Sequence, residues 1–291
     1  MRFWGKFSKN IFKFVLRPQI RKLQPKLLEA VLAKSILMLD SEAIGEVKSF
    51  LVSKQTDQGG FSDRGGNCDL YYSLFGYYIA EALSVPEVIG PLKKYVAETV
   101  TKSHLSGVYL YCGAILYSKL IGSDAISEKL RKQIVSNLIH EKIEQPEYSG
   151  FLGILALYYL DDYRNIQRAI NQYTQIKTIA AQPCPVIAAT AVIQGITGKE
   201  KHEYAKFLKS FYRESGGFAA LYNAPSEDLL STGVTLYGLH FLDADIRMIK
   251  PDCISFVDNL YDNGGFKATE FDSITDVEYT FYGLLSLGSM S

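Results

Sequence analysis

The sequence predicts an all-α protein made of repeated helical hairpins, because two kinds of helix-forming segment alternate along its 291 residues. Charged amphipathic segments alternate with segments that have almost no polar face, and a helix that is apolar on every side must be buried on every side. The triplet Gly-Gly-Phe also recurs before three apolar segments, at 59–61, 216–218 and 264–266. Such a recurrence indicates an internal repeat. Together these observations favour a ring with apolar helices inside and amphipathic helices outside.

The first predicted element is an amphipathic helix over residues 2–17, which Pro18 should end. Residues 1–28 contain eight basic residues and no acidic one. The basic residues at 2, 6, 9, 13 and 17 fall on one side of this helix, opposite an apolar stripe that includes Phe3 and Trp4. Three interpretations fit this pattern: a helix packed on the ring, an interfacial helix in peripheral contact with a membrane, and an organelle-targeting peptide.

The rest of the chain is expected to hold six pairs of outer and inner helices without a linker. We assign residues 1–40 to a basic helical arm, with a second helix near 24–39, and residues 41–291 to the ring. Amphipathic outer helices are predicted near 43–55, 87–102, 124–143, 162–177, 200–213 and 250–261. Apolar inner helices are predicted near 69–83, 105–120, 148–160, 184–196, 228–242 and 276–288.

The composition excludes several classes of protein. Charge is balanced, with 31 basic and 31 acidic residues, whereas nucleic-acid-binding proteins usually carry a basic excess. The four cysteines, at 68, 112, 184 and 253, lie far apart, which argues against a disulfide framework or a cysteine-rich zinc site and favours a reducing compartment. No apolar run approaches the length of about 20 residues that spans a bilayer. We therefore expect a cytoplasmic protein, peripheral at the inner membrane face if the arm binds lipid.

Two stretches in the first repeat carry a resemblance to a known family. Gly-Gly-Phe-Ser-Asp-Arg at 59–64, followed by Asp-Leu-Tyr-Tyr-Ser-Leu-Phe-Gly at 69–76, is similar to the repeat of protein prenyltransferase β-subunits and of squalene/terpene cyclases. The resemblance implies an α/α toroid of six outer–inner hairpins around a central cavity. It also implies an isoprenoid or other lipidic ligand and a helical partner protein.

The metal site of the prenyltransferases is not retained when the motif is carried over residue by residue. The family's zinc ligands resemble Asp-x-Cys at one inner-helix start and Asp-x-x-His at the next. Here Asp228 keeps the aspartate, Leu230 stands at the cysteine position and Tyr279 at the histidine position. Since leucine and neutral tyrosine do not replace thiolate and imidazole as zinc ligands, we predict no cofactor. Mg²⁺ remains compatible with a diphosphate substrate.

The candidate site lies where the inner helices begin, because their free N–H groups and dipoles meet at one mouth of the toroid. The candidate catalytic acids are Asp69, Asp228, Asp276 and Glu278. The candidate substrate-binding residues are Arg64, Tyr72, Tyr109, Cys112, Tyr148 and Tyr279. Simpler roles compete with each assignment: the aspartates are preferred helix N-caps, the tyrosines can fill helix–helix contacts, and cysteine is a common small buried residue.

Three functional hypotheses follow. The first is an isoprenoid-acting enzyme that transfers or cyclises a prenyl chain by acid or carbocation chemistry. The second is a non-catalytic toroid that binds a lipid or a partner protein. The third is an enzyme that modifies a peptide or natural product in the same cavity. An open cavity with clustered acids would favour the first and third hypotheses, and a filled one the second.

Overall fold

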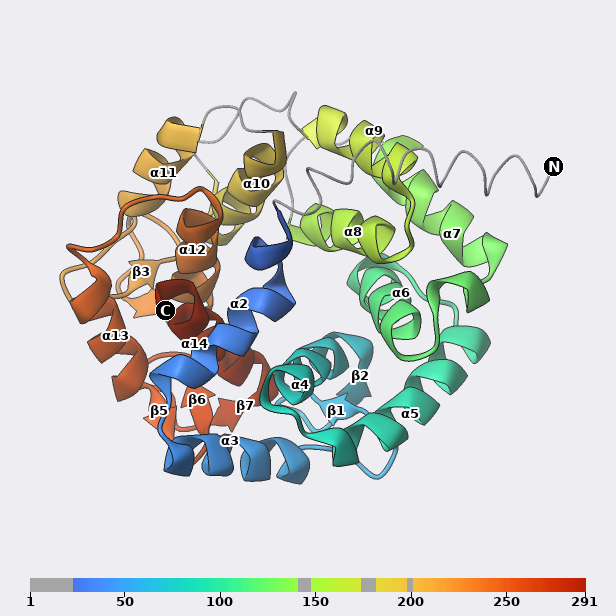
Figure 1. Cartoon of the computed structure of the whole chain (residues 1–291), viewed down its shortest axis with the longest axis horizontal. Helices are drawn as coiled ribbons and strands as arrows, with labels where there is room; N and C mark the ends of the chain where they lie inside the picture. The colour runs from blue at the N-terminus through green and yellow to red at the C-terminus, as the bar shows by residue number, and fades with distance from the viewer. Residues whose placement is uncertain (1–22, 141–147, 174–181, 198–200) are drawn as a thin grey trace.

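The computed structural model describes residues 23–140, 148–173, 182–197 and 201–291. Its helices form a ring with an inner and an outer layer (Figure 1). The all-α fold and the toroid implied by the resemblance are confirmed. The inner helices are α4 (Leu70–Leu83), α6 (Gly107–Leu120), α8 (Tyr148–Tyr159), α10 (Cys184–Thr197), α12 (Leu229–Phe241) and α14 (Val277–Met290). The outer helices are α3 (Ser41–Ser53), α5 (Ile89–Lys102), α7 (Glu128–Val135), α9 (Tyr163–Tyr173), α11 (Lys201–Lys209) and α13 (Lys250–Asn259).

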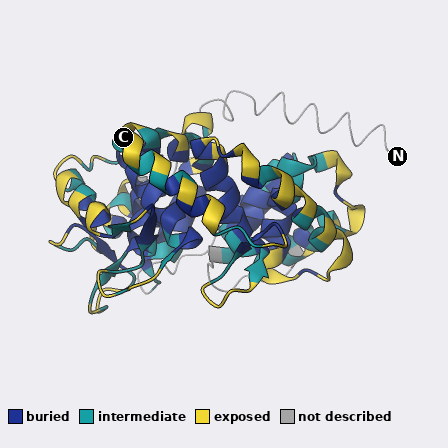
Figure 2. Cartoon of the chain, turned by 90° about the horizontal axis from the view of Figure 1, so that it is seen from below, coloured by how far each residue is buried: buried dark blue, intermediate teal, exposed yellow. Residues whose placement is uncertain are grey.

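The ring closes on itself. Successive inner helices pack against each other, and α14 packs against α4. Figure 2 shows the buried residues concentrated on the inner helices and the exposed ones on the outer helices and loops. The prediction that the apolar segments lie inside is confirmed by the complete burial of residues such as Ile79, Leu110 and Leu236.

The Gly-Gly-Phe loops form small antiparallel strand pairs, an element that the sequence did not predict. These pairs are β1 (Phe61–Ser62) with β2 (Cys68–Asp69), β3 (Phe218–Ala219) with β4 (Glu227–Asp228), and β6 (Gly265–Lys267) with β5 (Tyr261–Asp262) and β7 (Thr275–Asp276). In each repeat the phenylalanine of the triplet lies opposite the aspartate that begins the inner helix.

A hydroxyl group four residues after each of these aspartates fixes the phenylalanine. The backbone N–H of Phe61 donates to Ser73 Oγ at 3.0 Å, and the two later repeats use Thr232 and Thr280 in the same way. The three phenylalanines are at most 1% exposed, so an unpaired N–H there would be costly. In each repeat, the buried phenylalanine is therefore held both by the strand pair and by the first turns of the inner helix.

The first glycine of each triplet joins the loop to an outer helix. Gly59, Gly216 and Gly264 have φ angles of +93°, +99° and +84°, which L-residues rarely adopt. A Cβ on Gly264 would lie 2.3 Å from the carbonyl oxygen of Glu46 in α3. Since α3 is the first outer helix and Gly264 belongs to the last repeat, this contact helps to close the ring.

A short N-terminal segment crosses the ring where the inner helices end. We call it the strap; it comprises η1 (Gln24–Lys26), α2 (Leu28–Lys34) and η2 (Ser35–Met38). Figure 1 shows α2 running across the middle of the ring, and α2 packs against α4 and α14. The second helix predicted near 24–39 is therefore present but broken into three pieces. The amphipathic helix predicted at 2–17 lies outside the described residues.

No helix among the described residues is long and apolar enough to cross a membrane. The four cysteines are free thiols, and Cys112, Cys184 and Cys253 are buried.

Candidate functional site

The three predicted aspartates all cap inner helices. Asp69 accepts a hydrogen bond from the backbone N–H of Tyr72 at 2.7 Å, and Asp276 accepts one from Tyr279 at 2.8 Å. Asp228 accepts from both the N–H and the hydroxyl of Ser231, each at 2.7 Å. Burial raises the pKa of Asp69 and of Asp228, and these hydrogen bonds oppose that rise. The geometry thus gives each aspartate a structural role at its helix start.

Arg64 connects the first glycine loop to the last one. Its Nε donates to Asp276 Oδ2 at 2.5 Å, and its Nη1 donates to Asp272 Oδ2 at 2.7 Å. The guanidinium carbon also lies 5.0 Å from the centre of the Tyr279 ring. Two predicted site residues, Arg64 and Tyr279, are therefore brought together with Asp276. The guanidinium already neutralises two carboxylates, which leaves it poorly placed to hold a diphosphate.

Glu278 lies beside this cluster and is only 9% exposed. The hydroxyl of Tyr71 donates to Glu278 Oε1 at 2.7 Å. Burial raises the pKa of Glu278, and the hydrogen bond from Tyr71 opposes the rise. We call Arg64, Tyr71, Asp272, Asp276 and Glu278 the mouth cluster. Tyr71 and Asp272 were not among the predicted residues.

Of the remaining predicted residues, Tyr72 also contacts the mouth cluster. It lies next to Tyr71 on α4, its ring packs edge-on against that of Tyr71, and its side chain is hydrogen-bonded to Glu278. Burial, and then the charge of Glu278, raise the pKa of the Tyr72 phenol. Tyr109 is 47% exposed near the start of α6. Cys112 is completely buried, which raises the pKa of its thiol and leaves it protonated at neutral pH. Tyr148 is the first residue of α8, and its side chain lies outside the described part of the chain.

The rim of this mouth carries exposed apolar side chains on two of the glycine loops. Leu221 and Tyr222, in the loop between β3 and β4, are 44% and 48% exposed. Phe271 and Ile274, in the loop between β6 and β7, are 81% and 50% exposed.

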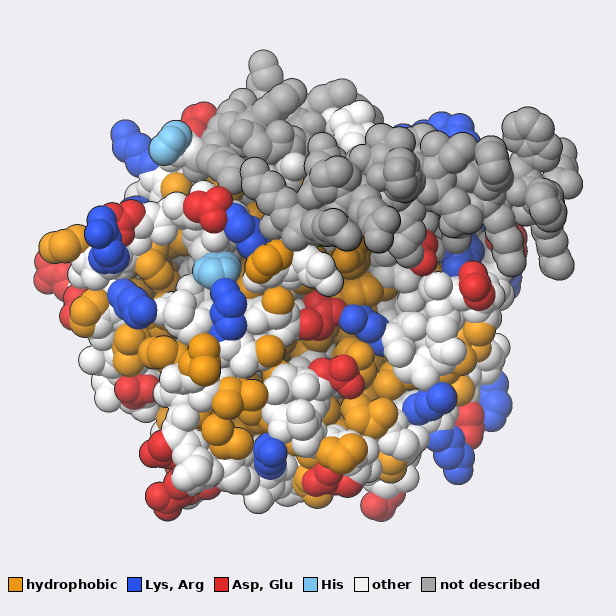
Figure 3. Space-filling model, viewed as in Figure 1, with side chains coloured by type: hydrophobic (Ala, Val, Ile, Leu, Met, Phe, Trp, Pro, Cys, Tyr) orange, Lys and Arg blue, Asp and Glu red, His pale blue; other side chains and the backbone are white. Residues whose placement is uncertain are grey.

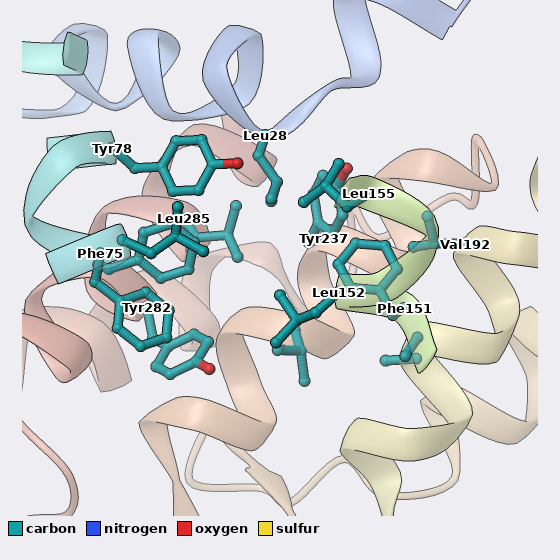
Figure 4. A pocket seen from close by; sticks show the side chains of 15 residues that line it. Leu28, Phe75, Tyr78, Phe151, Leu152, Leu155, Val192, Tyr237, Tyr282 and Leu285 are labelled. Atoms are coloured by element: carbon teal, nitrogen blue, oxygen red, sulfur yellow. The ribbon is translucent and has the colours of Figure 1, made fainter. Parts of the chain in front are cut away.

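The centre of the ring is nearly filled by side chains. An axial cavity of about 30 Å³ remains, which has room for one water molecule. Figure 4 shows Phe75, Tyr78, Tyr237 and Tyr282 converging on it. Phe75 packs on Phe281 with ring centres 4.8 Å apart. On the face that Figure 3 shows, the described residues likewise leave no open channel at the ring centre.

A larger cavity of about 130 Å³ lies beside the axial one, between the start of the strap and the helices α8, α9, α10 and α12. We call it the outer cavity. Its walls are aliphatic and aromatic, with the amide of Gln167 and the tyrosine hydroxyls as the polar groups. Five residues line both cavities: Leu28, Phe151, Leu155, Val192 and Tyr237. The sequence analysis did not predict this cavity, because its walls come from segments about 200 residues apart along the chain.

Among the described residues, no group of three His, Cys, Asp or Glu side chains is arranged to hold a metal ion. Leu230 and Tyr279 occupy the positions where the resemblance would require a thiolate and an imidazole.

Comparison with known protein families gives a match. A family model described as prenyltransferase alpha-alpha toroid domain matches residues 30–97 and 184–290. A search of curated proteins finds no significant match. The two matched segments include all three Gly-Gly-Phe repeats, the strap from residue 30 onward, and both sides of the ring closure. Because they make up more than half of the chain, the protein belongs to the prenyltransferase alpha-alpha toroid domain family.

Proposed function

We propose that this toroid binds an isoprenoid or another lipidic chain in the outer cavity, without catalysing its transfer or cyclisation. The observation that carries the proposal is the apolar outer cavity of about 130 Å³ beside a ring axis that is nearly filled. A cavity of about 150 Å³ with a similar lining binds benzene in another protein. The outer cavity thus has the chemistry and the scale for a short stretch of hydrocarbon.

The candidate catalytic acids support a binding role over a catalytic one. Asp69, Asp228 and Asp276 are engaged as helix caps, and Asp276 is also paired with Arg64. Glu278 accepts a hydrogen bond from Tyr71. Between these acids and the outer cavity lies the aromatic filling of the axis, including Phe75 and Phe281. A chain in the outer cavity would not reach the acids without a large repacking of that filling.

The position of the outer cavity is also suited to ligand exchange with a membrane. Leu23, the first described residue, lines the cavity, and residues 2–17 precede it closely along the chain. If residues 2–17 bind anionic headgroups, they bring the cavity to a source of lipidic chains. Flotation with vesicles of phosphatidylglycerol and phosphatidylcholine tests this contact, with a variant lacking residues 2–17 as the comparison. Equal flotation of the two proteins would remove the membrane from the proposal.

Native mass spectrometry of the full chain with geraniol, farnesol and their diphosphates tests chain binding. We expect the wild-type protein to retain one alcohol molecule. The variant Ile196→Trp should lose about tenfold or more in affinity, equivalent to about 1.4 kcal/mol, because Ile196 lines the cavity and is 37% exposed, so the indole can fill the site without disturbing the core.

A matched control is Ile274→Trp, which places the same side chain on an exposed loop at the opposite mouth. It should bind the alcohols as the wild type does. If the wild-type protein binds none of these compounds and no prenyl alcohol of 5 carbons either, the proposal is overturned. Equal losses in both tryptophan variants would show that the effect does not come from the outer cavity.

A partner protein at the opposite mouth is a second candidate, and the exposed rim favours it. Phe271 and Ile274 are 81% and 50% exposed on one loop, and a contiguous exposed apolar patch marks an interaction site in many proteins. Sedimentation velocity of the full chain tests the simplest case, a second copy. A dimer that the double variant Phe271→Ser, Ile274→Ser converts to a monomer would support this candidate, and a monomeric wild type would contradict self-association through the rim.

A further inference from the structure

The two apolar cavities are separated by a thin layer of side chains, one of which does not belong to the ring. Phe151 and Leu155 come from α8, Val192 from α10 and Tyr237 from α12, and these helices are fixed in the ring. Leu28 is the first residue of α2 and comes from the strap. It is 7% exposed and points from above toward the axial cavity (Figure 4). Leu28 is therefore the separating side chain with the most freedom to be withdrawn.

The second half of the strap is anchored by apolar packing. Val31, Leu32 and Ser35 are completely buried. A Cβ on Gly288 of α14 would lie 2.0 Å from the carbonyl oxygen of Val31, so the two backbones are in direct contact. This half of the strap has no room to shift relative to α14.

Besides the apolar packing of Leu23 and Leu28, the first half of the strap is held by polar contacts at the ring surface. Lys26 Nζ donates to the carbonyl oxygen of Phe241 at 2.8 Å and pairs with the exposed carboxylate of Asp243. Tyr237 donates to the carbonyl oxygen of Lys26 at 2.9 Å. Partly exposed ion pairs of this kind contribute little to stability, so residues 23–29 can detach more readily than residues 31–35.

Glu29 forms the other side of this attachment. Its Oε1 accepts hydrogen bonds from Lys119 of α6 and Tyr159 of α8. Its Oε2 is buried and has no hydrogen-bond partner among the described residues. An unsatisfied buried carboxylate oxygen destabilises the closed arrangement and would regain water when the segment lifts.

We propose that residues 23–29 act as a lid, and that Leu28 sets the length of the chain that the outer cavity accepts. With the lid closed, the accessible space of about 130 Å³ is close to that of a benzene-sized site and fits about one five-carbon unit. When Leu28 withdraws, the outer and axial cavities join, and a longer chain can extend toward Phe75 and Leu285. This inference rests on the proposed function, because it assumes that the outer cavity takes an apolar chain.

The test compares the affinities of prenyl alcohols with 5, 10, 15 and 20 carbons for variants at residue 28, by native mass spectrometry and by isothermal titration calorimetry. Leu28→Ala should bind the 15-carbon alcohol about tenfold more tightly than the wild type does and leave the affinity for the 5-carbon alcohol nearly unchanged. Leu28→Phe should have the opposite effect, because the larger ring closes the passage between the cavities.

Leu32→Ala is the matched control, since Leu32 lies four residues farther along α2, is completely buried and lines neither cavity. It should lower the melting temperature without changing the order of affinities across the alcohols. Glu29→Gln removes the charge that pairs with Lys119 and should speed association of the 15-carbon alcohol several-fold, while the 5-carbon alcohol binds at its wild-type rate.

The outcomes separate the two proposals. Absence of binding of every alcohol to the wild type would reject the proposed function and the lid with it. Binding by the wild type, with the same order of affinities in Leu28→Ala and Leu28→Phe, would reject the role of Leu28 alone. A shift produced equally by Leu32→Ala would show that general loosening of the strap is the cause, which would also overturn the assignment to Leu28.

Discussion

Gly264→Ala should lower the free energy of unfolding by more than the cost of the backbone conformation alone, because the added Cβ also pushes against α3. An alanine at a φ of +84° costs about 1–2 kcal/mol. Its Cβ would also lie 2.3 Å from the carbonyl oxygen of Glu46, so α3 has to move away from the last repeat. Overpacking of this kind costs about 1–3 kcal/mol. The sum, about 2–5 kcal/mol, corresponds to a melting temperature lower by about 4–10 °C for a chain of this size.

Two glycines of the same protein allow the contributions to be separated. Gly66 has a φ of +82°, and no atom lies within 4 Å of the position that a Cβ would take there, so Gly66→Ala should show the conformational cost alone. Gly45, next to Glu46 in α3, also has open space around it. Because alanine is the better helix former, Gly45→Ala should stabilise the protein by about 0.5–1 kcal/mol.

Urea unfolding of the three variants, followed by far-ultraviolet circular dichroism, measures these differences. The expected order of stability is Gly45→Ala, wild type, Gly66→Ala and Gly264→Ala. If Gly264→Ala loses no more stability than Gly66→Ala, the contact with α3 does not help to hold the ring closed, and the reasoning is refuted.

Three further predictions concern the mouth cluster and the repeat. Burial raises the folded-state pKa of Glu278, so its contribution to stability is present below its ordinary pKa of 4.5 and is lost as pH rises through the raised value. Glu278→Gln should therefore raise the melting temperature at pH 7 and make no difference at pH 4. An equal effect at both pH values would contradict the raised pKa. Arg64→Met leaves Asp276 buried without its cation and should cost about 2 kcal/mol of stability, less than the roughly 3–5 kcal/mol of a fully buried pair. In chemical denaturation, adding Asp276→Asn to this variant should recover part of the loss. Additive effects of the two changes would argue against the pairing. Thr232→Val removes the acceptor for the buried N–H of Phe218 and should cost about 1–3 kcal/mol, whereas Thr101→Val on the exposed face of α5 should change the free energy of unfolding by less than about 0.5 kcal/mol.

The fold could be predicted because its signals are local. The apolar character of α4, α12 and α14 is visible within each segment, and Asp69, Asp228 and Asp276 stand where an N-cap is expected. The short strands were missed because two or three residues carry no alternation from which a strand could be read. Their pairing depends on the hydrogen bond from Phe61 to Ser73 and its equivalents, which link positions 12 to 14 residues apart.

The candidate site was harder to predict because its contacts are distant in sequence. Arg64 and Glu278 were singled out, but their partners Asp272 and Tyr71 lie more than 200 residues away from them along the chain. Tyr72 was chosen and its neighbour Tyr71 was missed, although the side chains of both are hydrogen-bonded to Glu278. The outer cavity depends on how the strap is laid over the ring, and the sequence contains no pattern that fixes that placement.

The strap also constrains the order in which the protein can mature. A ribosome makes the strap before the groups that hold it: Glu29 waits for Lys119 and Tyr159, Lys26 for Phe241 and Asp243, and Val31 for Gly288. Until α14 has emerged, the side of α2 that packs against α14 stays uncovered, which exposes a nascent chain to aggregation or to capture by a chaperone. A chain that stops before α14 would keep this part of the strap uncovered, so the seated strap marks a closed ring.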